Sequence, residues 1–309
     1  MSICIGESLI DFVPVEETDS LPLYRPVAGG SPYNCAIAAA RLEGNVAFAG
    51  TVSRDFFGDQ IVERLQANGV SLSMIARVDR PTTLAFVKKE SGGAARYAFF
   101  TNDAADRALS LDAIPQPLPS EALLQMGSIS LIADPEGSTI LELAEREHGR
   151  RVIVFDPNIR ESLIVDEADY RSRLERAIQV ATVLKTSDED LSWIYPELST
   201  KEAAARARAA GVRLVVVTQG AKGSTAYTAG GELFVPADEV EVSDTIGAGD
   251  SFMAALLVRL DELGATTPDA VASLDEVALR DLLTFAARIS AVTCTRVGAD
   301  PPYRSEVSV

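Results

Sequence analysis

The stretch VSDTIGAGDSFMAALLVRL, residues 242–260, places two glycines and an alanine directly before an apolar helical run. The first amides of a helix have no partner within the helix, and the helix dipole adds partial positive charge there. Because Gly247 and Gly249 lack side chains, the main chain can approach a ligand closely at this turn. The pattern therefore indicates an anion-binding turn, although Gly-x-Gly also precedes many helices that bind nothing.

Asp250 directly follows the second glycine and narrows this interpretation. A carboxylate beside a polyphosphate is electrostatically unfavourable unless it takes a proton from an incoming hydroxyl group. Phosphoryl transfer to an alcohol needs this arrangement, with N–H donors for the phosphoryl charge and a carboxylate for the nucleophile. We therefore expect Asp250 to act as the catalytic base. The stabilising amides would be those of Gly247, Ala248 and Gly249.

The overall composition limits the possible partners and compartments. Lys and Arg number 28 against 45 Asp and Glu, and the resulting net charge of −17 argues against nucleic-acid binding. Apolar runs stay well short of the roughly 18 residues of a membrane span, so no membrane insertion is predicted. The three scattered cysteines, Cys4, Cys35 and Cys294, suit a reduced, cytoplasmic protein better than a disulfide framework.

The chain has a single histidine, His148, in the polar stretch EREHGRR, where a solvated helix end accounts for it. A lone histidine without a cysteine cluster argues against the usual zinc ligand sets. It also weakens any Ser-His or Cys-His mechanism. Acid–base chemistry would therefore fall to carboxylates, lysine or tyrosine.

Short β-branched runs alternate with helical stretches along most of the chain. SICIGESLIDF (2–12), VAFAGTV (46–52) and RVIVFD (151–156) are typical of buried strands, whereas SPYNCAIAAARLEG (31–44) and TKEAAARARAAGV (200–212) are typical of helices. This alternation predicts an α/β fold with a mainly parallel sheet and helices on both faces. We expect residues 1–309 to form a single domain.

Residues 83–100, TLAFVKKESGGAARYAFF, interrupt this alternation. Two alternating runs about a Gly-Gly turn predict a β-hairpin without a crossover helix. Together with residues 12–28 the hairpin region, about 83–102, could form a small antiparallel lid outside the main sheet. Such a lid would cover a site at the carboxyl ends of the strands. An edge extension of the main sheet explains the same pattern equally well.

Two motifs together resemble the ribokinase-like (PfkB) family of carbohydrate kinases. DTIGAGDSF (244–252) resembles the family's C-terminal D-T-x-G-A-G-D signature, and GGSPYNCAIAAARLEG (29–44) resembles its N-terminal Gly-Gly-x-x-x-Asn helix start. The resemblance implies a three-layer α/β/α sandwich with a small β lid. It also implies ATP-dependent phosphorylation of a sugar hydroxymethyl group, with Mg²⁺ bridging the phosphates.

The resemblance implies that an acid early in the chain and the Gly-Gly-Asn segment bind the sugar hydroxyls. Here these positions are Asp11, Gly29, Gly30 and Asn34. A carboxylate and an amide can accept from and donate to vicinal hydroxyls, and glycines permit close approach. Alternatively, Asn34 could be a helix cap and Asp11 a solvated strand end.

The middle of the chain resembles fructokinase-like members of the family. FDPNIRESL (155–163) matches their D-x-N-x-R segment, and FFTNDAADRAL (99–109) matches their aromatic–Ala-Asp-Arg stretch. The resemblance implies that Asn158 lies near the metal and phosphates, and that Arg160 lies near the transferred phosphate or the substrate. The planar guanidinium suits anionic oxygens. A structural salt bridge is the alternative for Arg160.

The nucleotide side is also implied by the resemblance. KTSDEDL (185–191) occupies the place of the family's Asn-x-x-Glu, but its ends differ, with Ser187 and Asp190 in those positions. Lys185 and Ser187 would lie near ATP, and Asp190 would hold Mg²⁺ through waters, which magnesium retains in most protein sites. A merely solvated helix start is the alternative for these acids.

Two further segments complete the implied nucleotide site. VVVTQGAKGS (215–224) would place Thr218, Gly220 and Gly223 beside ATP, although a tight turn onto a hairpin would need the same glycines. TCTRVGADPP (293–302) resembles the loop that closes the adenine side. The residues that the resemblance suggests for a monovalent cation such as K⁺ are Asp244, Ile246 and Gly298.

These residues predict an ATP-dependent sugar kinase, with fructose as the favoured acceptor. Kinases of 2-keto-3-deoxygluconate or ribose are alternatives, the first because Arg96 and Arg107 could supply positive charge for a keto acid. A nucleoside acceptor is disfavoured by the aromatic content of 6%. A non-catalytic sugar or nucleotide sensor would not need Asp250. Lids of this family often pair between subunits, which suggests a homodimer.

Overall fold

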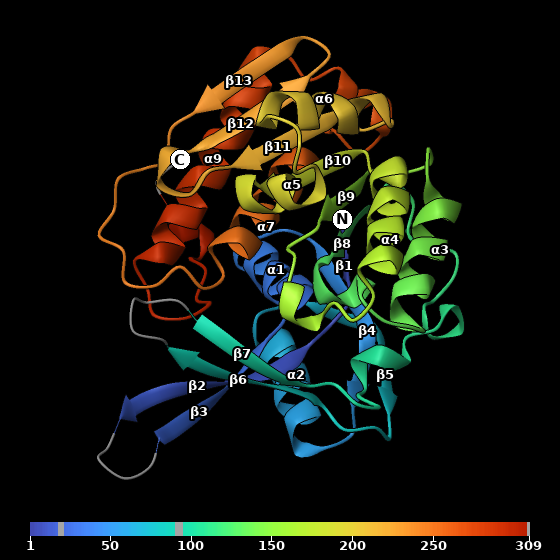
Figure 1. Ribbon diagram of the computed structural model, residues 1–309, viewed down its shortest axis with the longest axis vertical. Helices are drawn as coiled ribbons and strands as arrows, with labels where there is room; N and C mark the ends of the chain where they lie inside the picture. The colour runs from blue at the N-terminus through green and yellow to red at the C-terminus, as the bar shows by residue number, and fades with distance from the viewer. Residues whose placement is uncertain (18–21, 90–94, 308–309) are drawn as a thin grey trace.

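The computed structural model describes residues 1–17, 22–89 and 95–307. Within these residues the chain forms a nine-stranded sheet and a four-stranded sheet, and the small sheet lies below the main one in Figure 1. The main sheet has the order β13-β12-β11-β10-β9-β8-β1-β4-β5. Its strands are β1 (Ser2–Ile5), β4 (Val46–Ser53), β5 (Ser71–Val78), β8 (Leu123–Gly127), β9 (Ile153–Asp156), β10 (Val183–Ser187), β11 (Leu214–Thr218), β12 (Ser224–Thr228) and β13 (Gly231–Val235).

The main sheet is parallel from β5 to β11, and β12 and β13 add an antiparallel edge. Helices cover both faces, so the chain forms the three-layer α/β/α sandwich (Figure 1). The helices are α1 (Ser31–Arg41), α2 (Phe56–Ala67), α3 (Glu136–Glu147), α4 (Glu167–Val180), α5 (Asp188–Ile194), α6 (Thr200–Ala209), α7 (Ala248–Glu262), α8 (Pro268–Ala272) and α9 (Glu276–Cys294).

The inner strands of the main sheet contribute alternate side chains to two separate cores. In β1, Cys4 packs with α1, α7 and α9 on one face, whereas Ile3 and Ile5 pack with α3 and α4 on the other. Neighbouring side chains of a strand point to opposite faces, and a strand covered on both sides is therefore apolar throughout. This explains why the sheet strands are short, continuous apolar runs. None of the described helices is both long and apolar enough to cross a bilayer.

The small sheet has the order β3-β2-β6-β7. It consists of β2 (Leu9–Glu17), β3 (Pro22–Gly29), β6 (Thr83–Lys89) and β7 (Ala95–Phe100). The expected hairpin strands are confirmed, but the sheet is mixed rather than antiparallel because β2 and β6 run parallel. The predicted Gly-Gly turn falls at residues 92–93, outside the described residues. The alternative of an edge extension is wrong, since the described residues of these strands form a sheet separate from the main one.

The first apolar run contradicts the expected single strand. SICIGESLIDF divides at Gly6, so that β1 belongs to the main sheet and β2 to the small sheet. Gly6 has φ 141, and a Cβ there would lie 2.2 Å from Oγ of Ser130. This conformation and this close contact both require glycine, and the chain changes direction at the residue. The division leaves Glu7 at the junction of the two sheets.

Candidate active site

The Gly247 turn begins α7 at the carboxyl edge of the main sheet. Gly247 adopts φ 78, and a Cβ there would lie 2.8 Å from Cβ of Ala299. A Cβ on Gly249 would lie 3.3 Å from Nζ of Lys185. The turn therefore needs glycine for its conformation and brings the first turn of α7 close to a lysine ammonium. The amide of Ala248 donates to the carbonyl of Thr245 at 3.3 Å, so its role in anion binding stays a prediction.

Asp250 lies in the first turn of α7, where α1 holds its carboxylate from the other side. Oγ of Ser31 donates to Oδ1 at 2.6 Å, and Nδ2 of Asn34 donates to Oδ2 at 2.9 Å. Burial raises the pKa of Asp250, and these two hydrogen bonds oppose that effect because they favour the charged form. The two sequence motifs thus meet at one carboxylate. Sequence analysis missed Ser31, although it lies inside the quoted Gly-Gly segment.

Asp11 reaches the same space from the small sheet. A Cβ on Gly29 would lie 2.5 Å from Oδ2 of Asp11, so only glycine leaves room for this carboxylate. Burial raises the pKa of Asp11 to about 6, with Arg160 lowering it and Asp250 raising it. Asp11 lies within β2 and is largely enclosed, so the solvated strand end is not its role.

The start of α1 fixes the remaining residues of the sugar side. Gly30 is the N-cap with φ 114, and a Cβ there would lie 2.8 Å from the carbonyl oxygen of Glu7. Asn34 therefore lies in the second turn of α1 and does not cap it, so its side chain is free to bond Asp250. Asn34 thus bonds the Asp250 carboxylate, and Asp250 raises the pKa of Asp11. Sugar binding by Asp11, Gly29, Gly30 and Asn34 stays a prediction.

Glu7 supports the start of α1 from beneath and was missed from the sequence. Its Oε1 accepts from the amide of Ser31 at 3.0 Å, and Ser130 bonds its other carboxylate oxygen. The side chain is buried, and burial raises the pKa of Glu7 to about 7. Glu7 lies in the middle of the run predicted as one strand, and only the division at Gly6 places it directly after β1, at the carboxyl edge of the main sheet.

The Glu7→Gln variant is expected to lose part of the pH dependence of stability. The folded state keeps a proton that the unfolded state releases above its ordinary pKa of 4.5, so wild-type stability falls as pH rises towards the folded pKa of about 7. This fall in the wild-type free energy of unfolding is on the order of 3 kcal/mol. Urea unfolding at pH 5 and pH 8 measures it. Equal pH slopes for variant and wild type would contradict this assignment.

A buried ion pair lies beside the Gly247 turn. Nζ of Lys185, on β10, lies 2.7 Å from Oδ2 of Asp156 at the end of β9, with side chains 6% and 3% exposed. Burial lowers the pKa of Lys185, but the acids around it, Asp156 first and then Asp250 and Asp190, keep the net shift upward. Oδ1 of Asp156 is buried without a hydrogen-bond partner. The sequence around Asp156 did not indicate this pairing, because Lys185 lies 29 positions further along the chain.

Ser187 and Asp190 form the start of α5. Oγ of Ser187 accepts from the amide of Asp190 at 3.0 Å, and Oδ1 of Asp190 accepts from the amide of Ile159 at 3.3 Å. Burial, together with the charge of Asp156, raises the pKa of Asp190 to about 6. The carboxylate is therefore enclosed beside the ion pair rather than solvated. Among the described residues, no group of three or more acidic, His or Cys side chains has metal-site geometry.

Asn158 and Arg160 follow β9 at the same edge. Asn158 has φ 39, and its Nδ2 donates to Oγ of Ser128 at 3.4 Å. The exposed Arg160 donates to the carbonyl of Ile159 at 3.0 Å. Within the described part of the chain Arg160 makes no ion pair, so the structural salt bridge is not observed. Its charge nevertheless lowers the pKa of both Asp11 and Asp190.

The glycines after β11 have a structural explanation. Gly223 has φ 122, and a Cβ there would lie 2.2 Å from the carbonyl oxygen of Val235 in β13. The hairpin alternative therefore accounts for Gly223. Gly220 has φ 55 and no neighbour within 4 Å of a Cβ, and Oγ1 of Thr218 bonds the carbonyl of Thr186 at 3.4 Å. Contacts of Thr218, Gly220 and Gly223 with ATP remain predictions.

Asp244 joins the Gly247 turn to the C-terminal loop. Its Oδ1 accepts from the amide of Ile246 at 3.1 Å, and its Oδ2 accepts from the amide of Gly298 at 2.9 Å. The three residues suggested for a monovalent cation thus lie together. Arg107, by contrast, is buried with its Nε 3.9 Å from Oδ2 of Asp106, which balances its charge. The side chain of Arg96 lies outside the described part of the chain.

Comparison with known proteins agrees with this geometry. The model of the pfkB family carbohydrate kinases matches residues 1–306. A fructokinase from Rhizobium leguminosarum bv. trifolii is 40% identical over 91% of this chain and 86% of its own. Fructokinase with bound ATP from Xylella fastidiosa superposes with a TM-score of 0.89 at 28% identity, covering 96% of this chain and 93% of its own. Fructokinase from Vibrio cholerae O395, in a form with fructose, ADP and calcium ion bound, superposes with a TM-score of 0.83 at 29% identity. The match covers 96% of this chain and 94% of its own. The chain belongs to the pfkB family of carbohydrate kinases.

Proposed function

We propose that this sugar kinase transfers the γ-phosphate of ATP to a hydroxymethyl group of fructose, and that residues 1–309 act as one kinase domain. The observation that carries the proposal is the Asp250 carboxylate, held by Ser31 and Asn34 at the first turn of α7 beside Lys185. The fructokinase relatives support fructose as the acceptor. The pairing of Arg107 with Asp106 speaks against a keto-acid acceptor.

In the proposed mechanism, the sugar lies against Asp11, Gly29, Gly30 and Asn34. Asp250 takes the proton of the hydroxymethyl group, and the sugar oxygen forms a bond to the γ-phosphorus as the bond to the β-phosphate oxygen breaks. The ammonium of Lys185 and the amides of Gly247 and Gly249 stabilise the negative charge on the transferred group. ADP leaves with the electrons of the broken bond. Arg160 would bind the transferred phosphate or the sugar.

We propose that Mg²⁺ accompanies ATP. The unpartnered Oδ1 of Asp156 and the enclosed carboxylate of Asp190 fit an ion that uses one or two carboxylates and keeps several waters. When bound, Mg²⁺ would neutralise phosphate charge. Asn158 would then lie near the metal and the phosphates. Asp244, Ile246 and Gly298 are the proposed K⁺ loop, because it joins the Gly247 turn directly.

A coupled ADP-release assay tests the proposal across fructose, ribose and 2-keto-3-deoxygluconate. The expected result is the highest kcat/KM with fructose and little ATP hydrolysis without sugar. The low hydrolysis would follow from closure of the lid, proposed to comprise residues 12–28 and 83–102, over the sugar. Equal ATP hydrolysis with and without every sugar would contradict both the mechanism and the lid. Sugar binding without turnover would instead favour a sensor.

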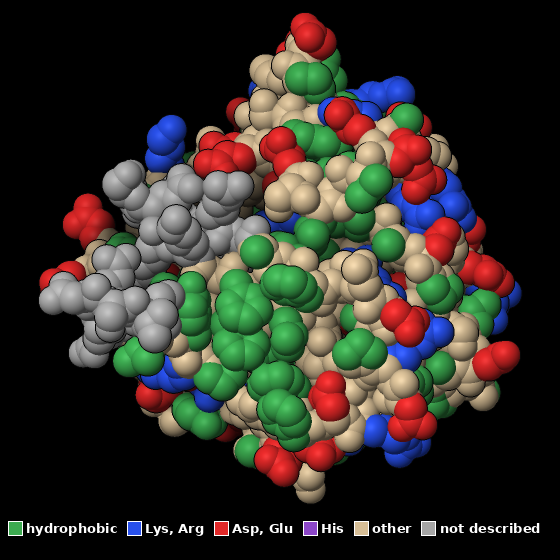
Figure 2. All heavy atoms as spheres, turned by 60° about the horizontal axis from the view of Figure 1, so that its bottom comes forward, with side chains coloured by type: hydrophobic (Ala, Val, Ile, Leu, Met, Phe, Trp, Pro, Cys, Tyr) green, Lys and Arg blue, Asp and Glu red, His purple; other side chains and the backbone are tan. Residues whose placement is uncertain are grey.

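We further propose a homodimer through the outer face of the small sheet. Phe12 and Phe86 are neighbours in β2 and β6 and stack at 4.5 Å, and Tyr24 and Phe100 pack edge-on against Phe86. These side chains alternate with Asp11 and so point away from the sugar. Figure 2 shows hydrophobic side chains gathered on the face that includes the small sheet. Phe100 is 61% exposed, which favours a covered state for this surface.

The Phe100→Asp variant is expected to be a monomer, because a charge in this aromatic face opposes desolvation. Size-exclusion chromatography with light scattering measures the mass. Phe234→Asp is the matched control, since Phe234 is also half-exposed but lies on β13, far along the other sheet. A wild-type monomer, or a dimer of the Phe100 variant, would contradict the lid interface.

A further inference from the structure

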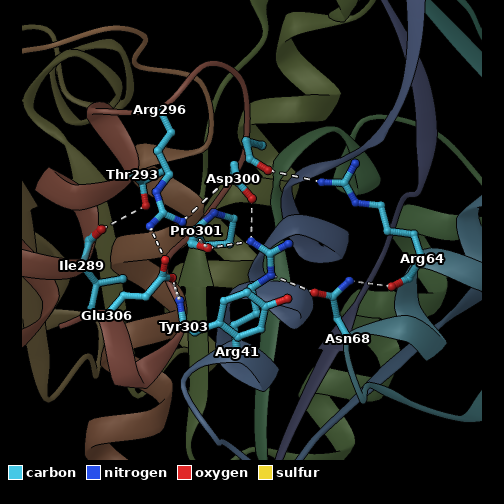
Figure 3. Close-up of polar contacts among 11 residues, drawn as sticks. Arg41, Arg64, Asn68, Ile289, Thr293, Arg296, Asp300, Pro301, Tyr303 and Glu306 are labelled. Atoms are coloured by element: carbon cyan, nitrogen blue, oxygen red, sulfur yellow. Dashed lines mark hydrogen bonds and ion pairs between the residues drawn. The ribbon is translucent and has the colours of Figure 1, made fainter.

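Arg41, the last residue of α1, is the centre of a polar network between three parts of the chain (Figure 3). Its Nε donates to Oδ1 of Asn68, the C-cap of α2, at 2.7 Å. Its NH1 donates to Oδ1 of Asp300 and to the carbonyl of Pro301, both at 2.6 Å. The guanidinium also lies over the ring of Tyr303, 4.7 Å from its centroid. The side chain is only 11% exposed, so these contacts are largely shielded from solvent.

The loop that Arg41 holds, residues 298–301, covers the Gly247 turn. Ala299 lies so close to Gly247 that a Cβ on the glycine would approach its Cβ to 2.8 Å. The amide of Gly298 donates to Asp244, the residue that also bonds Ile246 in the turn. The loop is thus held on one side by the turn and on the other by Arg41. A longer contact from Arg64 to the carbonyl of Ala299, at 3.4 Å, adds to the outer side.

We propose that Arg41 is a positioning residue for phosphate binding, which holds residues 298–301 against the Gly247 turn. The inference rests on the proposed function of that turn as the phosphate-binding element. Arg41 touches neither the sugar side nor the turn itself, so it acts through the loop. Its planar guanidinium can bond Asn68 and the loop at the same time, whereas a lysine ammonium has no such fixed geometry.

α1 thereby contributes to both halves of the reaction. Ser31 and Asn34 at its first two turns bond the Asp250 carboxylate, and Arg41 at its end fixes the loop over the neighbouring turn. A rigid helix keeps these two sets of contacts at a constant separation. Loss of Arg41 should therefore affect the phosphate side and leave the sugar side intact, which distinguishes positioning from general destabilisation.

The test compares Arg41→Ala and Arg41→Lys with Arg259→Ala as the matched control. Arg259 also pairs with carboxylates, Asp281 and Glu262, and lies over an aromatic ring, but it contacts no residue of the loop. The expected KM for ATP rises about tenfold in Arg41→Ala, with fructose KM within about twofold of wild type. The KM for ATP of Arg41→Lys should lie between those of the wild type and Arg41→Ala. Arg259→Ala should lose about as much thermal stability as Arg41→Ala but keep the wild-type KM values for ATP and for fructose.

Calorimetric titration with ATP in the absence of sugar separates this inference from the proposed function. If the wild type binds ATP but phosphorylates no sugar, the proposed function fails, and a weaker ATP affinity of Arg41→Ala still supports the positioning role. A combined Arg41→Ala/Asp300→Ala variant should bind ATP only slightly more weakly than Arg41→Ala alone, because the second change removes in addition only the longer contact of Asp300 with Arg296, at 3.6 Å. Unchanged ATP affinity in Arg41→Ala, or an equal loss in Arg259→Ala, would overturn the inference.

Discussion

The Asp250→Asn variant is expected to lose kcat by between about 10² and 10⁴-fold, the range attributed to general acid–base groups. Asparagine has nearly the same shape and can still accept a hydrogen bond from Ser31, but it cannot take a proton from the sugar hydroxyl. ATP binding should persist, because the amides and Lys185 are unchanged. Steady-state ADP release and calorimetric ATP binding measure the two effects separately.

Asp261→Asn is the matched control for this change. Asp261 lies on the same helix, α7, but its carboxylate bonds the N-terminal amine of Met1 at 3.0 Å, away from the turn. The control should therefore keep the wild-type kcat. If Asp250→Asn retained more than about a tenth of wild-type turnover, a carboxylate base at this position would be excluded.

Replacing Lys185 with methionine is expected to lower both stability and ATP affinity. The substitution leaves the buried carboxylate of Asp156 without its partner, and breaking such a pair costs about 3–5 kcal/mol. It also removes the ammonium beside Gly249, and a lost charge-assisted bond to phosphate weakens binding roughly ten- to a hundredfold. Urea unfolding and calorimetric titration with ATP report the two losses.

The double variant Lys185→Met/Asp156→Leu separates the two effects. In the double variant both positions are apolar and no unpaired charge is buried. Most of the stability that the single Lys185→Met variant loses should therefore return. ATP affinity should remain low, because no cation is restored beside the turn. A single Lys185 variant as stable as the wild type would show that the pair is not structurally important. A double variant with full ATP affinity would exclude Lys185 from phosphate binding.

The main sheet and the two motif regions could be predicted from the sequence, because both depend on local patterns of residues. Continuous apolar runs at β4 and β9 predicted buried parallel strands, and Gly247 with Asp250 indicated the turn and its acid. β8, LLQMG, was overlooked since it has no β-branched residue and follows a proline-rich segment. The division of the first run at Gly6 depends on contact with Ser130, more than 120 positions away, which no local pattern reveals.

The site residues that the sequence did not predict were missed for the same reason. Glu7, Ser31 and Asp156 act through partners distant in the chain, namely Ser130, Asp250 and Lys185. An acid at a strand end has many uses, and only the partner shows which applies. The roles of Asn34 and Asp11 could be implied by family resemblance, but their exclusion as helix cap and solvated strand end needed the spatial position of α1 and β2.

The two acids proposed to contact the sugar lie in different parts of the fold. Asp11 is carried by β2 of the small sheet, whereas Asp250 is carried by α7 on the main body. Acceptor choice and phosphate chemistry are consequently encoded in separable pieces of the chain. Mutations accumulating in β2, β3 and β6 can alter which carbohydrate is accepted while the phosphotransfer apparatus is inherited intact, and directed evolution towards new acceptors should begin in those strands.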